Sequence, residues 1–263
     1  MKKSDPIGIF DSGIGGTSIF KEIHKLLPLE HILYLADSKN APYGEKTKEE
    51  ITSLSFKNVD LLLSKNCKLI VVACNTATTS SIKELREKYK VPFIGIEPAI
   101  KPAALNSKTK AIGILATKGT LSSELFAQTT DLIAKDIELI EVVGNGLVEA
   151  VEDGEQGSEK THQLLKKLLA PMIEKKIDHL VLGCSHYPYL VPSIKKILPP
   201  HVQIIDSGEA VARQTKNVLK KKGLLASVQQ IKPEFYTNKN PQVLRDLLHQ
   251  GNSENFQVSY LDF

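Results

Sequence analysis

Short apolar runs alternate along the chain with longer segments in which apolar residues recur every three or four positions. In the first third, runs typical of buried strands cover residues 31–37 and 69–74, and residues 6–13 indicate a strand with its exit turn. The segments between them, 17–27 and 49–65, show the helical spacing. This part of the chain therefore predicts the order strand, helix, strand, helix, strand.

The same order returns in the second half of the chain. Strand-like runs cover residues 110–120, 137–143 and 179–184, and the helical spacing covers 122–133 and 161–173. The separation between matched positions drifts by only a few residues along the repeat. We infer that one unit of three strands and two helices has been duplicated.

The duplicated order predicts an α/β protein with two pseudo-symmetric lobes and mainly parallel sheets, because repeated strand-helix-strand units require right-handed crossovers. The proline-bracketed segment 97–103 is a candidate for the crossing between lobes. The predicted lobes are residues 1–97 with 210–263, and residues 98–209. The tail, with predicted helices over 211–223 and 241–251, has no counterpart in the repeat, so we expect it to pack on the first lobe. The active site should lie in the cleft between the lobes.

Composition and charge narrow the class of protein. Hydrophobic residues make up 41% of the 263 residues, which is ample for buried cores. The formal net charge of +4 is spread along the chain, arginine is scarce and tryptophan is absent, so we expect no nucleic-acid partner. No apolar run approaches the ~20 residues of a membrane span, so we expect no membrane partner. Three cysteines, an odd number, suit a reducing compartment, and the expected location is cytoplasmic.

Two of the strand-like runs end in a cysteine that is followed by polar residues and then by helical spacing. Cys74 ends the first of these runs and Cys184 ends its counterpart in the repeat. A single cysteine at such a position is usually inert packing, which is how we interpret Cys67, but a thiol at the same turn of both repeats favours function. Helix amides would help each thiolate to form. We therefore predict a two-thiol active site.

A glycine-rich turn, FDSGIGG, follows the first strand. It is a poor dinucleotide loop, because Ser18 stands where the third glycine belongs and Asp11 would repel a phosphate. Asp11 is either a helix cap or a site residue. Gly13 and Gly15 would allow backbone amides to approach a small anion closely.

Further polar residues of the strand-end loops either cap helices or serve a site. His186 lies two residues after the second thiol and could exchange a proton with it. Two thiols and a histidine can also hold a catalytic zinc, but no short-spaced pair of ligands supports this, so we expect no metal. The residues available to bind a carboxylate are Ser12, Asn75, Thr76, Thr117, Thr120 and Ser185, with Tyr43 and Gly44 in a turn after the second strand.

The ordered motifs IFDSGIGG, APYGEKT, VVACNTAT, LATKGT, VEDG and LGCSHYP resemble those of the glutamate racemases, within the aspartate/glutamate racemase superfamily. The resemblance spans residues 7–208. His186 favours the glutamate branch, because the aspartate branch tends to carry an acidic residue there. One departure is Ser185, where the family commonly has threonine; the hydroxyl is retained, so we expect altered packing rather than lost function.

This resemblance implies the cofactor-independent interconversion of L- and D-glutamate, which supplies D-glutamate for peptidoglycan. It implies that Cys74 and Cys184 are the acid/base residues on opposite faces of the substrate, that Asp11 and His186 assist them, and that Glu152 is a further polar active-site residue. The implied substrate contacts are Asp11, Ser12, Tyr43, Gly44, Asn75, Thr76, Ser185 and His186. Glutamate is the implied partner, no cofactor or metal is implied, and family members often form homodimers.

Three other functions compete with this interpretation. An aspartate racemase, or another amino-acid racemase of the superfamily, would differ in the chain length of its substrate. A thiol redox protein would need its two sulfurs within bonding distance, whereas a racemase needs a gap for a substrate. A non-catalytic amino-acid-binding protein would keep the hydroxyl groups but has no use for two thiols.

Overall fold

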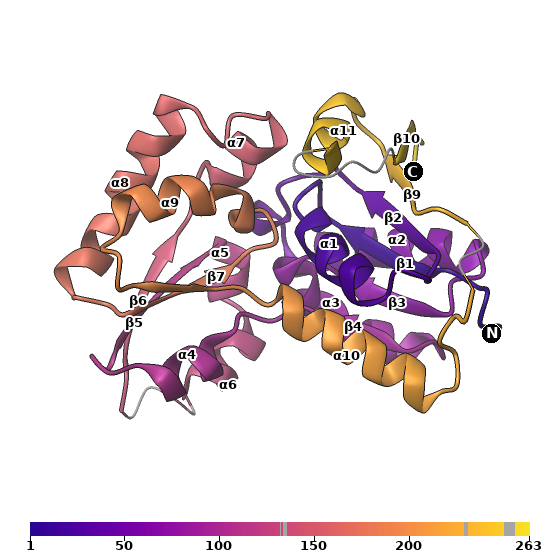
Figure 1. Ribbon diagram of the computed structural model, residues 1–263, viewed down its shortest axis with the longest axis horizontal. Coiled ribbons are helices and arrows are strands. Elements are labelled where there is room, and N and C mark those ends of the chain that lie inside the picture. Colours follow the sequence, from indigo (N-terminus) through magenta and orange to yellow (C-terminus); the bar gives the residue numbers. More distant parts are fainter. Residues whose placement is uncertain (132, 134–135, 229–230, 250–255) are drawn as a thin grey trace.

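Two parallel sheets lie side by side in the computed structural model, and each is covered by helices on both faces (Figure 1). The structure describes residues 1–131, 133, 136–228, 231–249 and 256–263. The first sheet contains, in spatial order, β10 (Gln257–Tyr260), β9 (Glu234–Thr237), β2 (Ile32–Ala36), β1 (Ile7–Asp11), β3 (Leu69–Val72) and β4 (Phe93–Gly95). The second contains β6 (Glu138–Val143), β5 (Ala111–Ala116), β7 (His179–Gly183) and β8 (Gln203–Ile205). The orders β2-β1-β3-β4 and β6-β5-β7-β8 are equivalent, and the prediction of two similar α/β lobes is confirmed.

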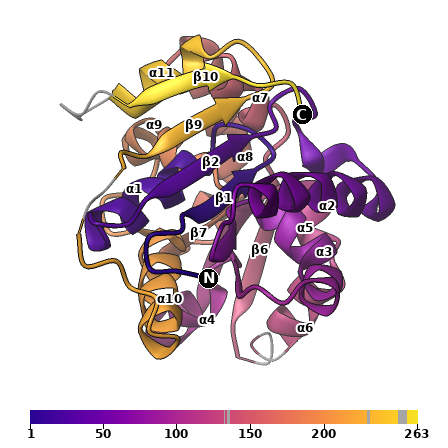
Figure 2. The same ribbon diagram turned by 90° about the vertical axis from the view of Figure 1, so that its right-hand side faces the viewer.

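The helices of each lobe follow the apolar spacing of the sequence. Those around the first sheet are α1 (Thr17–Leu26), α2 (Lys48–Ser64), α3 (Asn75–Lys88), α10 (Gly208–Lys221) and α11 (Gln242–His249). Those around the second are α4 (Ile100–Asn106), α5 (Lys118–Leu121), α6 (Glu124–Asp131), α7 (Leu147–Glu152), α8 (Glu159–Glu174) and α9 (Val191–Ile197). Figure 2 shows α1 and α10 on one side of the first sheet and α2 and α3 on the other.

Both faces of the central strands are buried, as parallel sheets require. In β1, Ile7 and Ile9 belong to the apolar core that includes Phe20 of α1, whereas Phe10 belongs to the core that includes Leu62 of α2. Successive side chains of a strand point to opposite faces, so one short apolar run serves both layers. This continuous burial explains why these strands appear in the sequence as apolar runs instead of alternating patterns.

The chain passes between the lobes twice, and the two crossings contact each other. The first follows β4 and the second follows β8, and the hydroxyl of Ser207 donates a hydrogen bond to the carbonyl of Glu97. After the second crossing, α10 packs against α1, and β9 pairs with β2 in parallel register. The lobe boundaries at 97/98 and 209/210 stay predictions, which we propose on the basis of these two crossings.

The segment after Cys184 differs from the prediction. The expected helix does not begin there; a 3₁₀ turn covers Tyr187–Leu190, and α9 begins only at Val191. Pro188 and Pro192 lack the N–H that a continuous helix would need. The predicted helices over 122–133 and 241–251 extend into residues 132, 250 and 251, which lie outside the described residues. Within the described ranges, no helix combines the length and the apolar character needed to cross a bilayer.

Candidate active site

Cys74 follows β3 directly and is the N-cap residue of α3. Its sulfur accepts a hydrogen bond from the amide of Ala77, at 3.4 Å, and its thiol donates one to the Ser12 hydroxyl, at 3.5 Å. Burial and the nearby Asp11 carboxylate raise the pKa of the Cys74 thiol, while the Ala77 amide and the Ser12 hydroxyl act in the opposite direction. The helix amide predicted from the sequence is therefore present, but burial outweighs it.

Cys184 occupies the equivalent position after β7, but it has a different neighbour. Its sulfur lies 3.8 Å from Nδ1 of His186, and Nε2 of the same ring lies 2.6 Å from Oε1 of Glu152. The prediction that a helix amide would assist Cys184 is wrong, because the chain turns here into a 3₁₀ segment. Burial alone would lower the pKa of His186, but the hydrogen bonds to Cys184 and Glu152 raise it well above its ordinary value. These two hydrogen bonds therefore favour the protonated form of the imidazole that faces this sulfur.

The glycine-rich turn of the first lobe closes over the His186–Glu152 pair of the second. The Ile14 amide donates a hydrogen bond to Oε1 of Glu152, at 2.6 Å. A Cβ atom on Gly13 would lie 1.8 Å from that carboxylate oxygen, and one on Gly15 would lie 2.3 Å from Nδ1 of His186. The glycines are therefore needed for close approach, and the anion that the turn binds here is a carboxylate of the protein itself.

The Asp11 carboxylate binds the amides of the turn before α1 and a hydroxyl of the Cys184 loop, whereas the N-cap residue of α1 is Gly16. One carboxylate oxygen accepts the amides of Gly16 (2.9 Å) and Gly13 (3.2 Å), and the other accepts the hydroxyl of Ser185 (3.0 Å). The side chain is fully buried, and burial raises its pKa although His186 and the Gly16 amide lower it. Asp11 therefore connects the glycine-rich turn of one lobe to the Cys184 loop of the other.

A small cavity of about 10 Å³ between the lobes is lined by both thiols. The other lining residues are Ser12, Pro42, Tyr43, Gly44, Asn75, Thr76, Thr117, Val148, Ser185 and His186. Every substrate contact implied by the resemblance lines this cavity except Asp11, which reaches it through Ser185. Both cysteines are free thiols and do not form the disulfide that a redox protein would use.

Asn75 carries the clearest mark of a binding group. Its side chain is 2% exposed and lines the cavity, yet neither its amide nitrogen nor its carbonyl oxygen has a hydrogen-bond partner. Leaving a buried polar atom unpaired costs roughly 1–3 kcal/mol. A bound molecule with both donors and acceptors would remove this cost.

Hydroxyl groups from both lobes meet beside Asn75. Thr76 Oγ1 lies 2.8 Å from Thr117 Oγ1, which lies 3.0 Å from Thr120 Oγ1. Sequence reasoning named all three threonines among the groups available to bind a carboxylate, and Thr76 and Thr117 line the cavity. It missed Pro42 and Val148, which line the cavity and carry no chemical signal in the sequence.

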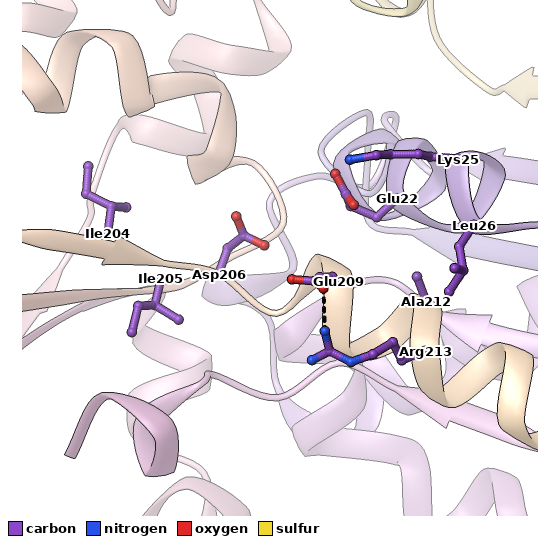
Figure 3. Close-up of a pocket in the computed structure, with 9 residues that line it drawn as sticks. All are labelled: Glu22, Lys25, Leu26, Ile204, Ile205, Asp206, Glu209, Ala212 and Arg213. Carbon is purple, nitrogen blue, oxygen red and sulfur yellow. Dashed lines mark hydrogen bonds and ion pairs between the residues drawn. The ribbon is translucent and has the colours of Figure 1, made fainter. Parts of the chain in front are cut away.

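A larger groove lies elsewhere among the described residues. Its volume is about 660 Å³, and Figure 3 shows its lining by α1, β8 and α10, with Arg213 paired to Glu209 at 2.5 Å. No thiol or hydroxyl lines it, and its charged side chains are largely open to solvent, so we place the chemistry at the thiols. Among the described residues no group of three or more histidine, cysteine or acidic side chains could hold a metal ion.

The fold and the site together define a class of enzyme. Two similar parallel α/β lobes that each direct one thiol into a shared cavity are the arrangement expected of a racemase, which needs one acid/base group on each face of its substrate. The chain belongs to the Asp/Glu/hydantoin racemase family, whose model matches residues 7–215.

Several relatives and structural neighbours of the chain are glutamate racemases. The enzyme of Pseudomonas paraeruginosa is 43% identical over 94% of this chain and 93% of its own. Glutamate racemase isoform RacE1 from Bacillus anthracis has a TM-score of 0.87 and 32% identity, covering 99% of this chain and 98% of its own. The Escherichia coli glutamate racemase, solved with L-glutamate and an activator, has a TM-score of 0.85 and 32% identity, covering 97% and 98%. The chain is thus an isomerase of the glutamate racemase group.

Proposed function

We propose that this protein interconverts L- and D-glutamate by proton transfer between Cys74 and Cys184, with no organic cofactor or metal ion. The observation that carries the proposal is the shared cavity, since both thiols line it together with the unpartnered amide of Asn75. The neighbouring structures solved with glutamate support the choice of substrate.

The reaction requires a base on one face of the α-carbon and an acid on the other. In the direction from L to D, the thiolate of Cys184 takes the α-proton, and the thiol of Cys74 donates its proton to the opposite face of the carbanion. The reverse direction exchanges the two roles. Each well-placed acid or base accelerates proton transfer by about 10²- to 10⁴-fold. This acceleration alone is not enough to remove a proton from so weak a carbon acid as the α-carbon of glutamate.

We assign the remaining stabilisation of the carbanion-like transition state to fixed polar groups around the substrate. The Asn75 amide can donate to a substrate carboxylate, and the hydroxyls of Thr76, Thr117 and Ser185 stand beside it. Preorganised donors of this kind stabilise the charge that develops on the substrate in the transition state. The protonated His186 contributes a positive charge next to Cys184.

Proton NMR of L-glutamate with the enzyme in D₂O tests the proposal. We expect the α-proton signal to disappear as deuterium enters and both enantiomers form. Chelator-treated, dialysed enzyme should keep this activity; activity that returned only with added pyridoxal phosphate or zinc would contradict the mechanism. Parallel assays with aspartate test the nearest alternative, an aspartate racemase.

The cellular role follows from this product. D-glutamate is a component of peptidoglycan, so we propose that the protein supplies cell-wall synthesis. The buried, unbonded cysteines favour a reducing compartment, and we propose a cytoplasmic location. The homodimer implied by the family resemblance stays a prediction, which analytical ultracentrifugation would check.

A further inference from the structure

Asp37 is a buried carboxylate outside the cavity that no part of the mechanism uses. It follows β2 and is 2% exposed. One of its oxygens accepts the hydroxyl of Tyr43 at 2.5 Å. The other accepts the side-chain amides of Asn40, at 2.7 Å, and Asn238, at 2.6 Å. Three donors thus converge on one carboxylate, which makes it the centre of a buried polar network.

Tyr43 connects this network to the cavity. Its side chain is 1% exposed, and with Gly44 it lines the wall beside the thiols. Its hydroxyl donates to Asp37 and accepts from the amide of Asn58, at 3.2 Å. Burial and the Asp37 carboxylate raise the pKa of this phenol, so it stays a neutral donor. The proton of Tyr43 is therefore committed to Asp37, and the residue serves the site through the position of its turn.

Asn238 brings the tail of the chain into the same network. It follows β9, the strand that the tail adds beside β2. Its amide nitrogen donates to Asp37 and, at 3.2 Å, to the main-chain carbonyl of Phe263, and its oxygen accepts the Lys39 amide at 2.8 Å. One buried side chain of the tail thus holds both the Asp37 carboxylate and the loop that follows it.

We propose that Asp37, held by Asn238, is a positioning residue that fixes the Tyr43–Gly44 turn against the active-site cavity. The inference rests on the proposed function, because it assumes that this turn contacts the substrate. The turn has little freedom to move without changing the cavity, since a Cβ on Gly44 would lie 2.9 Å from the Cβ of Thr117 on the other lobe. The tail, which has no equivalent in the repeat, therefore takes part in substrate binding without touching the substrate.

The test replaces the tail residue and leaves the cavity wall unchanged. Asn238→Ala should raise KM for both enantiomers about tenfold and change kcat by less than about threefold, because a displaced turn weakens substrate binding throughout the reaction. The matched control is Asn240→Ala. Asn240 is exposed, lies in the same tail loop and accepts the Gln242 amide at 3.0 Å, so its loss should lower the melting temperature while KM stays unchanged.

A double-mutant cycle tests whether the effect passes through Tyr43. If Asn238 acts through Asp37 on the phenol, Asn238→Ala should add nothing to the KM of Tyr43→Phe. An unchanged KM in Asn238→Ala, or effects of the two substitutions that multiply, would overturn the inference. If Asn238→Ala does not fold, Asp37→Asn is measured in its place and should show the same rise in KM.

A crystal structure of Asn238→Ala separates this inference from the proposed function. A displaced Tyr43–Gly44 turn would support the positioning role whatever the substrate is, and a turn in its original place would refute it. Failure of the wild-type protein to racemise glutamate would refute the proposed function alone.

Discussion

Gly15→Ala tests whether the glycine-rich turn must lie in contact with His186, the histidine beside Cys184. The new Cβ would lie 2.3 Å from Nδ1 and 2.4 Å from Cγ of His186, whereas non-bonded atoms settle at about 3.5–4.0 Å. A shift of more than about 1 Å is therefore required. The His186 ring is 0% exposed and held by Glu152 at 2.6 Å, so neither partner moves freely. Gly15 does not have a positive φ, so the substitution changes the contact and not the backbone preference.

The expected losses follow from this overlap. Overpacking of this kind costs about 1–3 kcal/mol of stability, and a misplacement of about 1 Å costs about 10²-fold in rate. We expect kcat/KM to fall about 100-fold in the D₂O exchange assay, with a lower melting temperature. The control is Gly157→Ala, because no atom lies within 4 Å of the Cβ it would add. Activity of Gly15→Ala within about threefold of wild type would refute the steric argument.

Three further predictions concern the thiols and their neighbours. Cys74→Ser and Cys184→Ser should each abolish racemisation, because a serine hydroxyl is too weak an acid and base; residual turnover in either variant would contradict the two-thiol mechanism. Asp11→Asn and His186→Asn should each reduce kcat more in one direction than in the other, and His186→Asn should mainly reduce kcat from L to D. Polarimetry measures both directions, and equal losses of kcat would mean that these two residues bind the substrate and do not tune individual thiols. Burial raises the pKa of the Cys67 thiol from 9.0 to about 12, so the folded state keeps this proton after the unfolded chain has lost it. The contribution of Cys67 to the free energy of unfolding is therefore fully present below the pKa of the unfolded chain and is lost as pH rises towards 12. In urea titrations, Cys67→Ala should make the decline of this free energy with pH shallower by about 1.4 kcal/mol per pH unit. Parallel curves for the variant and the wild type would disprove the argument.

The strands and the two thiols could be predicted from the sequence because their signals are local. A run such as β3 is apolar throughout, since both of its faces are buried, and it ends at Cys74. The repeat then located Cys184 without any knowledge of contacts. The prediction of a helix directly after Cys184 was wrong for an equally local reason. The apolar spacing indicated a helix, but Pro188 and Pro192 prevent a continuous one from beginning there.

The partners of the site residues could not be predicted in the same way. Glu152 and Ile14 are 138 positions apart, and Asp37 and Asn238 are 201 apart, yet each pair is joined by a hydrogen bond of 2.6 Å. Such pairs depend on how two lobes and a tail pack together, and a single sequence contains no periodic signal for that packing. The glycines of the FDSGIGG turn illustrate the limit: their flexibility was evident, but the side chains they make room for were not.

Duplication accounts for the geometry of the site, and divergence of the two loops accounts for its charge. Equivalent strand ends bring both sulfurs to one cavity, but burial and Asp11 favour the protonated form of Cys74, whereas the imidazolium of His186 faces Cys184. A racemase with two identical thiol environments would have no preferred location for the single proton that the pair must share. Burial and Asp11 hold the proton on Cys74, and the proposed mechanism requires a protonated Cys74 in the direction from L to D. In the mechanism proposed above, turnover from L to D moves the proton of the pair from Cys74 to Cys184. An imidazolium at His186 already carries both ring protons and cannot accept this one, so the pair returns to its starting state only when Cys184 releases a proton and Cys74 takes one up, in a reverse turnover or through water.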